Sequence, residues 1–411
     1  MFAMGMGAQP ISPAERMDFM DIFRGLAVFG IFFVNILYMS TPDLFYQRGG
    51  ALPEESALDQ GIRLAIDMFL AGKCYPILSF LFGLGFFLFM RRSEQKGERA
   101  YRLFSRRMLI LFLLGIVHMA FFYNGDVLHN YALIGCLLML FYRRKDKTVL
   151  VWALSILVVY LAMFSLAFLQ PEETLKAGML TNAKIAQEEA AAAIEVNRDG
   201  DYGQWLSFHL REEVLPNLQG EQIGYPSMFA MMLLGFYCGR IGVFENIGKY
   251  ARFIRRIRTI SGTASLLTAI LLGCTRLGYI ESGAYQGQLG QFLIYGCGLF
   301  LSFLYLSVLT LLMTKPGFVN LLQPLKFAGR MSLTNYLLQS VVSIGFFTGL
   351  GLYATLNFLE IVGYCLIVIA VEIGFSLWWM NRMPLGPMEW VWRRFTYGKL
   401  HRARKGGSVS A

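Results

Sequence analysis

Charged residues are scarce in this sequence. Asp, Glu, Lys and Arg make up 16% of its 411 residues, whereas soluble domains average roughly 25%. Apolar residues make up 56%, and Phe, Met and Gly are abundant, with 35, 21 and 42 copies. This composition suits helices that pack closely inside a lipid bilayer. It excludes an ordinary soluble globular protein and predicts an all-α integral membrane protein.

The sequence also lacks the motifs of several enzyme and metal-binding classes. Its six cysteines form no CxxC or Cys/His pairing, so neither a disulfide framework nor a zinc site is indicated. No GxSxG, Walker, HExxH or strand-linked GxGxxG pattern occurs. We therefore expect no metal cofactor. A cleavable signal peptide is not expected either, because no A-x-A-like site ends the first apolar run.

Ten apolar stretches are long enough to cross a bilayer. A hydrocarbon core of about 30 Å needs about 20 mostly apolar residues per helix. Apart from Glu372, the stretches contain no Asp, Glu, Lys or Arg, and they cover residues 25–42, 74–90, 108–125, 127–142, 148–171, 222–239, 259–275, 282–314, 331–359 and 361–381. We predict about ten transmembrane helices in a single polytopic domain, residues 1–411.

Positive charges fall on alternate connections between these stretches. Together, 29 of the 37 Lys and Arg lie in the N-terminal segment and in residues 91–107, 143–147, 240–258, 315–330 and 382–411. Short loops rich in Lys and Arg remain in the cytoplasm. Both termini are therefore predicted to be cytoplasmic, with residues 382–411 a basic tail. The same pattern explains the net charge of +10 without a nucleic-acid partner and leaves membrane lipids as the expected surroundings.

One predicted extracytoplasmic connection, residues 172–221, is much longer than the others. It is acidic and contains an Ala-rich stretch at 186–196 and an aromatic stretch at 202–210, both of which predict short helices. Two interpretations stay open. The loop is either a lid over a cavity that opens outward or a solvated hairpin.

The third and fourth predicted spans hold the densest group of ionisable side chains. His118 lies within the third span, and Asp126 and His129 stand at the start of the fourth. A tight turn at residues 124–126 would bring the three together near the outer leaflet. A histidine oriented by a carboxylate is suited to be a general base, so these are the predicted catalytic residues. The structural alternative is that Asp126 caps the fourth helix and His129 lies at the interface.

Polar residues elsewhere in or beside the spans are the predicted binding residues. They are Asp18, Asp21, Arg24, Asn35, Lys73, Arg106, Arg107, Tyr131, Asn335 and Gln339. Each group has a structural alternative. Asp21 and Arg24 could match the dipole at a helix start, and Lys73 could be an interfacial anchor.

Asn335 and Gln339 belong to a polar stripe on an otherwise apolar helix, with Tyr336 beside it. Such stripes line substrate paths or hold helices together. Glu372, an acid deep within the last span, either lines a polar interior or pairs with another helix.

Four blocks of sequence, in order along the chain, carry a resemblance to a known family. They are RMDFMDIFRGLAVFGIFFVN from Arg16, LSFLFGLG from Leu78, His118 with GDVLHNYALIG, and GRMSLTNYLLQS with GPMEWVWRRFTY. Through them the chain resembles the YeiB-like family of bacterial inner-membrane proteins. It is more distantly similar to the transmembrane acyltransferase superfamily, which includes heparan-α-glucosaminide N-acetyltransferases.

The resemblance implies a membrane acyltransferase. Such a protein takes an acyl group from cytoplasmic acyl-CoA, here expected to be acetyl-CoA, and delivers it to an extracytoplasmic sugar or other small acceptor. His118 would correspond to the catalytic histidine, and Asp18, Asp21, Arg24 and Asn35 to the first-helix motif. Arg106 and Arg107 could meet the donor phosphates.

One alternative is a small-solute transporter, with His118, Asn335 and Glu372 as a binding or proton-relay site. Another is a structural or sensing protein that binds a partner through residues 172–221. The bacterial inner membrane is the expected location. The oligomeric state is open, with a homodimer as one alternative.

Overall fold

The computed structural model describes residues 13–50 and 55–397, and every regular element in those ranges is a helix. The predicted all-α fold is therefore confirmed. From the beginning of the chain the helices are α1 (Pro13–Ser40), α2 (Asp43–Gly49), α3 (Ala57–Phe69), α4 (Cys74–Gln95), α5 (Ala100–Phe121), α6 (Leu128–Phe141), α7 (Asp146–Leu166), η1 (Ala167–Leu169), α8 (Glu172–Asp199), α9 (Tyr202–Phe208), η2 (His209–Val214) and α10 (Leu215–Gly220). They continue with η3 (Glu221–Gly224), α11 (Tyr225–Arg240), α12 (Ile247–Arg276), η4 (Gly283–Tyr285), α13 (Gln286–Gln291), η5 (Phe292–Gly296), α14 (Gly298–Leu312), α15 (Pro316–Leu321), α16 (Gln323–Arg330), α17 (Ser332–Phe347), α18 (Phe358–Met380) and α19 (Pro387–Tyr397).

Each of the ten predicted spans overlaps a helix, but residues 348–357 of the ninth form the connection between α17 and α18. Among the described residues, seven helical segments are long and apolar enough to cross a membrane. The other three predicted spans correspond to α6, α11 and α17, which have 14, 16 and 16 residues. In the apolar windows of α7, α12 and α18 only 22% of the residues are buried, so these helices turn apolar faces outward, as lipid contact requires. The chain is a multi-pass membrane protein, and the count of ten spans stays a prediction.

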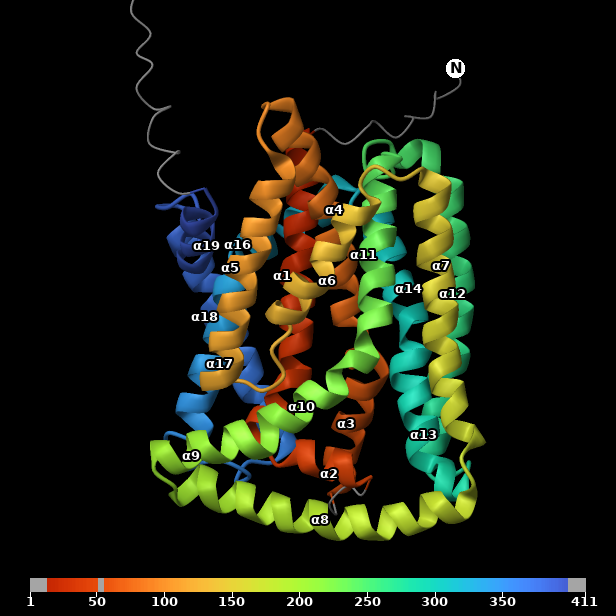
Figure 1. Cartoon of the computed structure of the whole chain (residues 1–411), viewed down its shortest axis with the longest axis vertical. Helices are drawn as coiled ribbons and strands as arrows, with labels where there is room; N and C mark the ends of the chain where they lie inside the picture. Colours follow the sequence, from red (N-terminus) through yellow and green to blue (C-terminus); the bar gives the residue numbers. More distant parts are fainter. Residues whose placement is uncertain (1–12, 51–54, 398–411) are drawn as a thin grey trace, which may run out of the picture.

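The helices form a bundle with two different ends (Figure 1). The start of α1, the α4–α5 connection and α19 lie at one end, which we call the basic end because the Lys- and Arg-rich connections gather there. Helices α2, α8 and α9 lie at the other, which we call the capped end. The cytoplasmic location of both termini stays a prediction, and residues 1–12 and 398–411 lie outside the described ranges.

Helix α8 lies across the capped end, roughly at right angles to the bundle (Figure 1). It has 28 residues, so residues 172–221 contain one long helix where the sequence pattern predicts short ones. Its length follows from a sequence rich in Ala, Glu, Lys and Leu, which are good helix formers, with no Pro between Glu172 and Asp199. Arg198 at its end donates to the carbonyl oxygens of Tyr353 and Ala354 over 2.7 Å each, which ties α8 to the connection between α17 and α18.

After α8 the chain is helical without a break from Tyr202 to Arg240, through α9, η2, α10, η3 and α11. This run crosses the capped end and then turns up into the bundle as α11 (Figure 1). Its middle contains a π-helical segment, η2. Such segments often occur at functional sites.

Close helix packing depends on glycine at two interfaces. A Cβ at Gly235 of α11 would lie 1.8 Å from the carbonyl oxygen of Phe80, and one at Gly83 of α4 would lie 1.8 Å from that of Met232. A Cβ at Gly329 of α16 would lie 1.6 Å from the carbonyl oxygen of Asp21. Small residues that bring backbones together are typical of helix association in lipid.

Candidate functional site

The candidate site lies where α5 ends and α6 begins, toward the capped end. The two helices form a hairpin through residues 122–127. A Cβ at Gly115 would lie 2.4 Å from the backbone nitrogen of His129 and 2.7 Å from Oδ2 of Asp126. The absence of a side chain at Gly115 therefore lets the start of α6 lie directly against α5, one turn from His118.

His118 is 2% exposed, and its ring nitrogens have different surroundings. Nδ1 lies 2.8 Å from Oδ1 of Asp126, whereas Nε2 is buried and has no hydrogen-bond partner. An ionised carboxylate only accepts hydrogen bonds, so Nδ1 carries a proton, and in the neutral tautomer with that proton Nε2 has a free lone pair. This is the arrangement of a general base held by an orienting carboxylate.

Asp126 accepts hydrogen bonds on both carboxylate oxygens. Oδ1 faces His118, and Oδ2 lies 3.0 Å from both the backbone nitrogen and Nδ1 of His129. Burial alone would raise the pKa of Asp126, but the hydrogen bonds from His118 and His129 lower it below its ordinary value. The contact with the His129 backbone is the helix cap that the capping interpretation of Asp126 predicts, and the catalytic interpretation stays a prediction.

Hydrogen bonds extend the cluster of His118, Asp126 and His129 to Glu221 of η3. Nε2 of His129 lies 3.0 Å from Oε1 of Glu221, which also accepts from the Tyr225 hydroxyl at 2.8 Å. Asn130 donates to Oε2 at 3.1 Å. Burial alone would raise the pKa of Glu221, and these hydrogen bonds lower it instead.

Aromatic rings surround His118. Those of Tyr336, Phe122 and Tyr123 have centroids 5.2, 6.2 and 6.4 Å from the imidazole. The hydroxyl of Tyr336 accepts from the backbone nitrogen of Val127 at 3.3 Å and lies 3.5 Å from Oδ1 of Asp126. Helix α17 therefore reaches the hairpin through Tyr336.

The structure brings together all three predicted catalytic residues, but it places several predicted binding residues in contacts between helices. Tyr131 donates to the Tyr75 carbonyl oxygen at 3.0 Å, and Lys73 donates to that of Asp67 at 2.6 Å. Asn335 donates to the Ala328 carbonyl oxygen and to Ser376, and Gln339 donates to Glu372 at 2.9 Å. These contacts match the helix-joining alternative for the polar stripe.

The remaining predicted binding residues lie on α1 and at the basic end. Asp18 pairs with Lys326 at 2.5 Å and Asp21 with Arg24 at 3.4 Å, whereas Asn35 is buried within α1. Arg106 is exposed. The guanidinium of Arg107 lies 3.8 Å from the ring centroid of Trp392 in α19.

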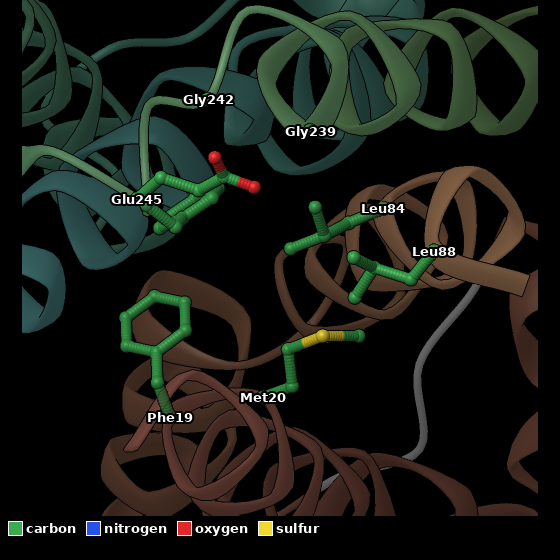
Figure 2. A pocket seen from close by; sticks show the side chains of 8 residues that line it. Phe19, Met20, Leu84, Leu88, Gly239, Gly242 and Glu245 are labelled. Carbon is green, nitrogen blue, oxygen red and sulfur yellow. The ribbon is translucent and has the colours of Figure 1, made fainter. Parts of the chain in front are cut away.

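A small apolar pocket opens near the basic end, between α1, α4 and the α11–α12 connection. Figure 2 shows Phe19, Met20, Leu84 and Leu88 around it, with Glu245 at its edge. Its volume of about 20 Å³ is room for about one water molecule, so an acyl chain needs more space than it offers.

Two residues of this region were not singled out from the sequence. Glu221 lies 92 positions from His129, and His209 lies 90 positions from Met119, whose carbonyl oxygen is 2.9 Å from Nε2 of His209. Their sequence signal is weak. The chain has only four histidines, and Glu221 is the last acid before the predicted sixth span.

Nearly the whole length of the chain has relatives among known proteins. A family model described as "Protein of unknown function (DUF418)" matches residues 238–399. "Uncharacterized protein YxaH" of Bacillus subtilis (strain 168) is 30% identical over 404 residues, covering 95% of this chain and 96% of the relative. The chain belongs to the YeiB-like DUF418 family.

Two further relatives are similar over nearly the same length. An "Uncharacterized 39.9 kDa protein in amylase 3'region" of Bacillus acidopullulyticus is 29% identical over 95% of this chain and 96% of its own. "Uncharacterized protein YeiB" of Escherichia coli (strain K12) is 25% identical over 93% of this chain and 96% of its own. No solved structure matches the chain.

Proposed function

We propose that this DUF418 protein is an acyltransferase of the bacterial cytoplasmic membrane. It moves an acetyl group from cytoplasmic acetyl-CoA to a hydroxyl or amine of a small acceptor, such as a sugar, on the outer side. The observation that carries the proposal is the buried His118, with Nδ1 2.8 Å from Asp126 and Nε2 without a partner. Ionisable groups at membrane depth are costly, and this one has the geometry of a base.

In the proposed reaction, Nε2 of His118 removes the proton from the acceptor hydroxyl or amine. The freed lone pair attacks the carbonyl carbon of the thioester, a C–O or C–N bond forms, the C–S bond breaks, and CoA leaves as a thiolate. The imidazolium formed at His118 is stabilised by Asp126. Asn335 already donates both amide hydrogens to Ala328 and Ser376, which leaves Asn35 as the proposed donor to the thioester oxygen.

The charge distribution supports binding of the donor at the basic end. Among the described residues around the start of α1, the cations Arg24, Arg107, Lys326, Arg330 and Arg393 outnumber the carboxylates Asp18, Asp21 and Glu245. An excess of positive charge favours an anionic ligand such as the CoA phosphates. Arg107 and His118 are 11 residues apart on α5, a rise of about 16 Å, so the thioester has to reach into the bundle.

The proposal is tested with inverted membrane vesicles from a bacterial host that expresses the full chain. In such vesicles the cytoplasmic face is outside, so acetyl-CoA labelled in its acetyl group reaches that face when it is added to the medium. We expect covalent transfer of label to lipid or luminal material, above vesicles that lack the protein. Equal incorporation in the two preparations would contradict the proposal.

One observation favours a transporter as a second candidate. Glu372 is buried in α18, where Oε2 accepts from Gln339 and Oε1 has no partner. A carboxyl of this kind at membrane depth is suited to carry a proton or bind a solute. The vesicle experiment separates the two functions, because label that enters the lumen without a covalent change supports transport and not acyl transfer.

A further inference from the structure

His129 lies between two carboxylates. Its Nδ1 is 3.0 Å from Oδ2 of Asp126, and its Nε2 is 3.0 and 3.2 Å from the two oxygens of Glu221. Because ionised carboxylates only accept hydrogen bonds, both ring nitrogens have to donate. His129 is then a doubly protonated imidazolium.

Both carboxylates have enough donors to remain ionised. Asp126 accepts from His118 and from two nitrogens of His129. Glu221 accepts from His129, Asn130 and Tyr225. Three hydrogen bonds to one carboxylate favour its charged form even when it is buried.

We propose that Glu221 is a positioning residue of the histidine site. By holding His129 as a cation, it fixes Asp126 as the ionised acceptor of the His118 Nδ1–H, so that the lone pair of Nε2 stays free. The effect on acyl transfer rests on the proposed function above, whereas the protonation state of His129 does not.

Glu221 reaches the site from the helical run across the capped end and not from the hairpin itself. That run is also attached to the hairpin by His209, which contacts the Met119 carbonyl oxygen, and by Asn217, which donates to the Asn124 carbonyl oxygen at 2.8 Å. The side-chain cluster is therefore complete only when the run is docked. This docking is what the lid interpretation of residues 172–221 requires.

Nuclear magnetic resonance of the ring nitrogens tests the protonation directly. The full-length protein is labelled with ¹⁵N-histidine and reconstituted in lipid nanodiscs at pH 7. With four histidines in the chain, the His129 signals are assigned by their absence in His129→Gln. We expect two protonated nitrogens at His129 in the parent protein, and one protonated and one bare nitrogen at His118.

Glu221→Gln is the informative variant. Its amide still reaches Nε2 of His129 but carries no negative charge, so His129 should keep the Nδ1 proton and lose the Nε2 proton. Glu213→Gln is the matched control, because Glu213 lies 2.6 Å from Nδ1 of His209 in the same run and does not contact Asp126. The control should change the His209 signals and leave those of His129 as they are.

The same two variants are compared in the vesicle transfer experiment. Glu221→Gln should reduce transfer by on the order of 10²-fold, as expected when a reacting group is poorly oriented. Glu213→Gln weakens the docking of the run but leaves both contacts of His129, so it should reduce transfer much less. An imidazolium at His129 that persists in Glu221→Gln would overturn the proposal, as would equal loss of transfer in both variants. If the parent protein transfers nothing while Glu221→Gln changes the His129 signals as expected, the proposed acyltransferase activity is wrong. The role of Glu221 in holding His129 as a cation is then still supported.

Discussion

The two ring nitrogens of His118 have different roles in the proposed base: Nδ1 holds the ring in place and Nε2 accepts the proton. Nδ1 is fixed by Asp126 over 2.8 Å, and Nε2 is buried without a partner. A buried nitrogen that lacks a hydrogen bond is destabilising by about 1–3 kcal/mol. Such a group is expected where a substrate atom completes the contact.

Asp126→Asn should reduce acetyl transfer by about 10²–10⁴-fold, the range for loss of proton transfer by a positioned base. Both carboxylate oxygens accept from ring nitrogens, whereas an amide offers only one oxygen, so its NH₂ group would face an N–H of His118 or His129. Label transfer in vesicles measures the loss. Transfer within a factor of two of the parental rate would show that Asp126 is only a helix cap.

Gly115→Ala should disturb the site without removing any functional group. The new methyl group would meet the His129 backbone at 2.4 Å, so α6 has to shift away from α5. We expect a loss of about 1–3 kcal/mol in stability from overpacking and a loss of transfer on the order of 10²-fold from misplacement of the base. Gly345→Ala in α17 is the control, because its Cβ would meet nothing within 4 Å. Equal effects of the two substitutions would argue against a role for the close approach of α5 and α6.

At the scale of helices, the run from Tyr202 to Arg240 joins the capped end to the bundle. Its π-helical segment begins at His209, whose Nδ1 lies 2.6 Å from Glu213 and whose ring stacks on Trp205 with centroids 4.9 Å apart. Trp205 in turn donates to Asn197 of α8 at 3.1 Å. The run is therefore held both to α8 and to the α5–α6 hairpin.

The docking of this run should depend on pH in both directions. Burial alone would lower the pKa of His209, but Glu213 raises it above its ordinary value of about 6.5. The stabilisation from His209 is therefore complete below that value and is lost as pH rises through the raised pKa. The pKa of Glu221 is lowered, so the stabilisation from Glu221 has the opposite pH dependence. It is present above about pH 4.5 and is lost as pH falls.

Hydrogen exchange of residues 202–224 measures this dependence, after correction for the intrinsic effect of pH on exchange. Protection should be greatest near neutral pH and decline on both sides. Glu213→Gln should remove most of the decline on the alkaline side, since it removes the charge that favours protonated His209. A decline of the same size in that variant would mean that another group is responsible.

Local patterns in the sequence predicted the helices and part of the site. The apolar runs predicted helices at all ten positions where spans were assigned. The predicted turn at 124–126 indicated that His118, Asp126 and His129 lie close together, and the structure confirms that they do. Glu221 could not be found in this way, because its partner is 92 residues distant and the bend of the run that delivers it is a tertiary feature. For the same reason the sequence alone is compatible with two interpretations of the polar stripe of α17, and its contacts with α18 come from the tertiary structure.

At the scale of the whole molecule, the two ends of the bundle differ in charge and cover. The basic end is predicted to face the cytoplasm, where acyl-CoA is available, and the capped end carries α8 and the run from Tyr202. His118 lies between the two ends, nearer the capped end of α5. This arrangement fits a donor and an acceptor that approach from opposite sides.

The orientation is tested with single cysteines at exposed lysines. Lys176→Cys lies on α8 at the capped end, and Lys96→Cys lies in the α4–α5 connection at the basic end. In intact cells a membrane-impermeant maleimide should label position 176 and not position 96, because the basic end is predicted to be cytoplasmic. The six native cysteines are first replaced, and permeabilised cells show that both positions can react. Labelling of position 96 alone in intact cells would show that the orientation is the reverse of the predicted one.

The central claim is that His118 is the base of an acyl transfer. His118→Gln keeps a polar side chain of similar reach but cannot take up a proton, so transfer of the labelled acetyl group in vesicles should fall by about 10²–10⁴-fold. The same variant in nanodiscs should bind acetyl-CoA in calorimetry as the parent protein does, because the proposed donor site lies at the other end of α5. That combination, lost transfer with retained binding, is the predicted result. Transfer at the parental rate in folded His118→Gln would contradict the account.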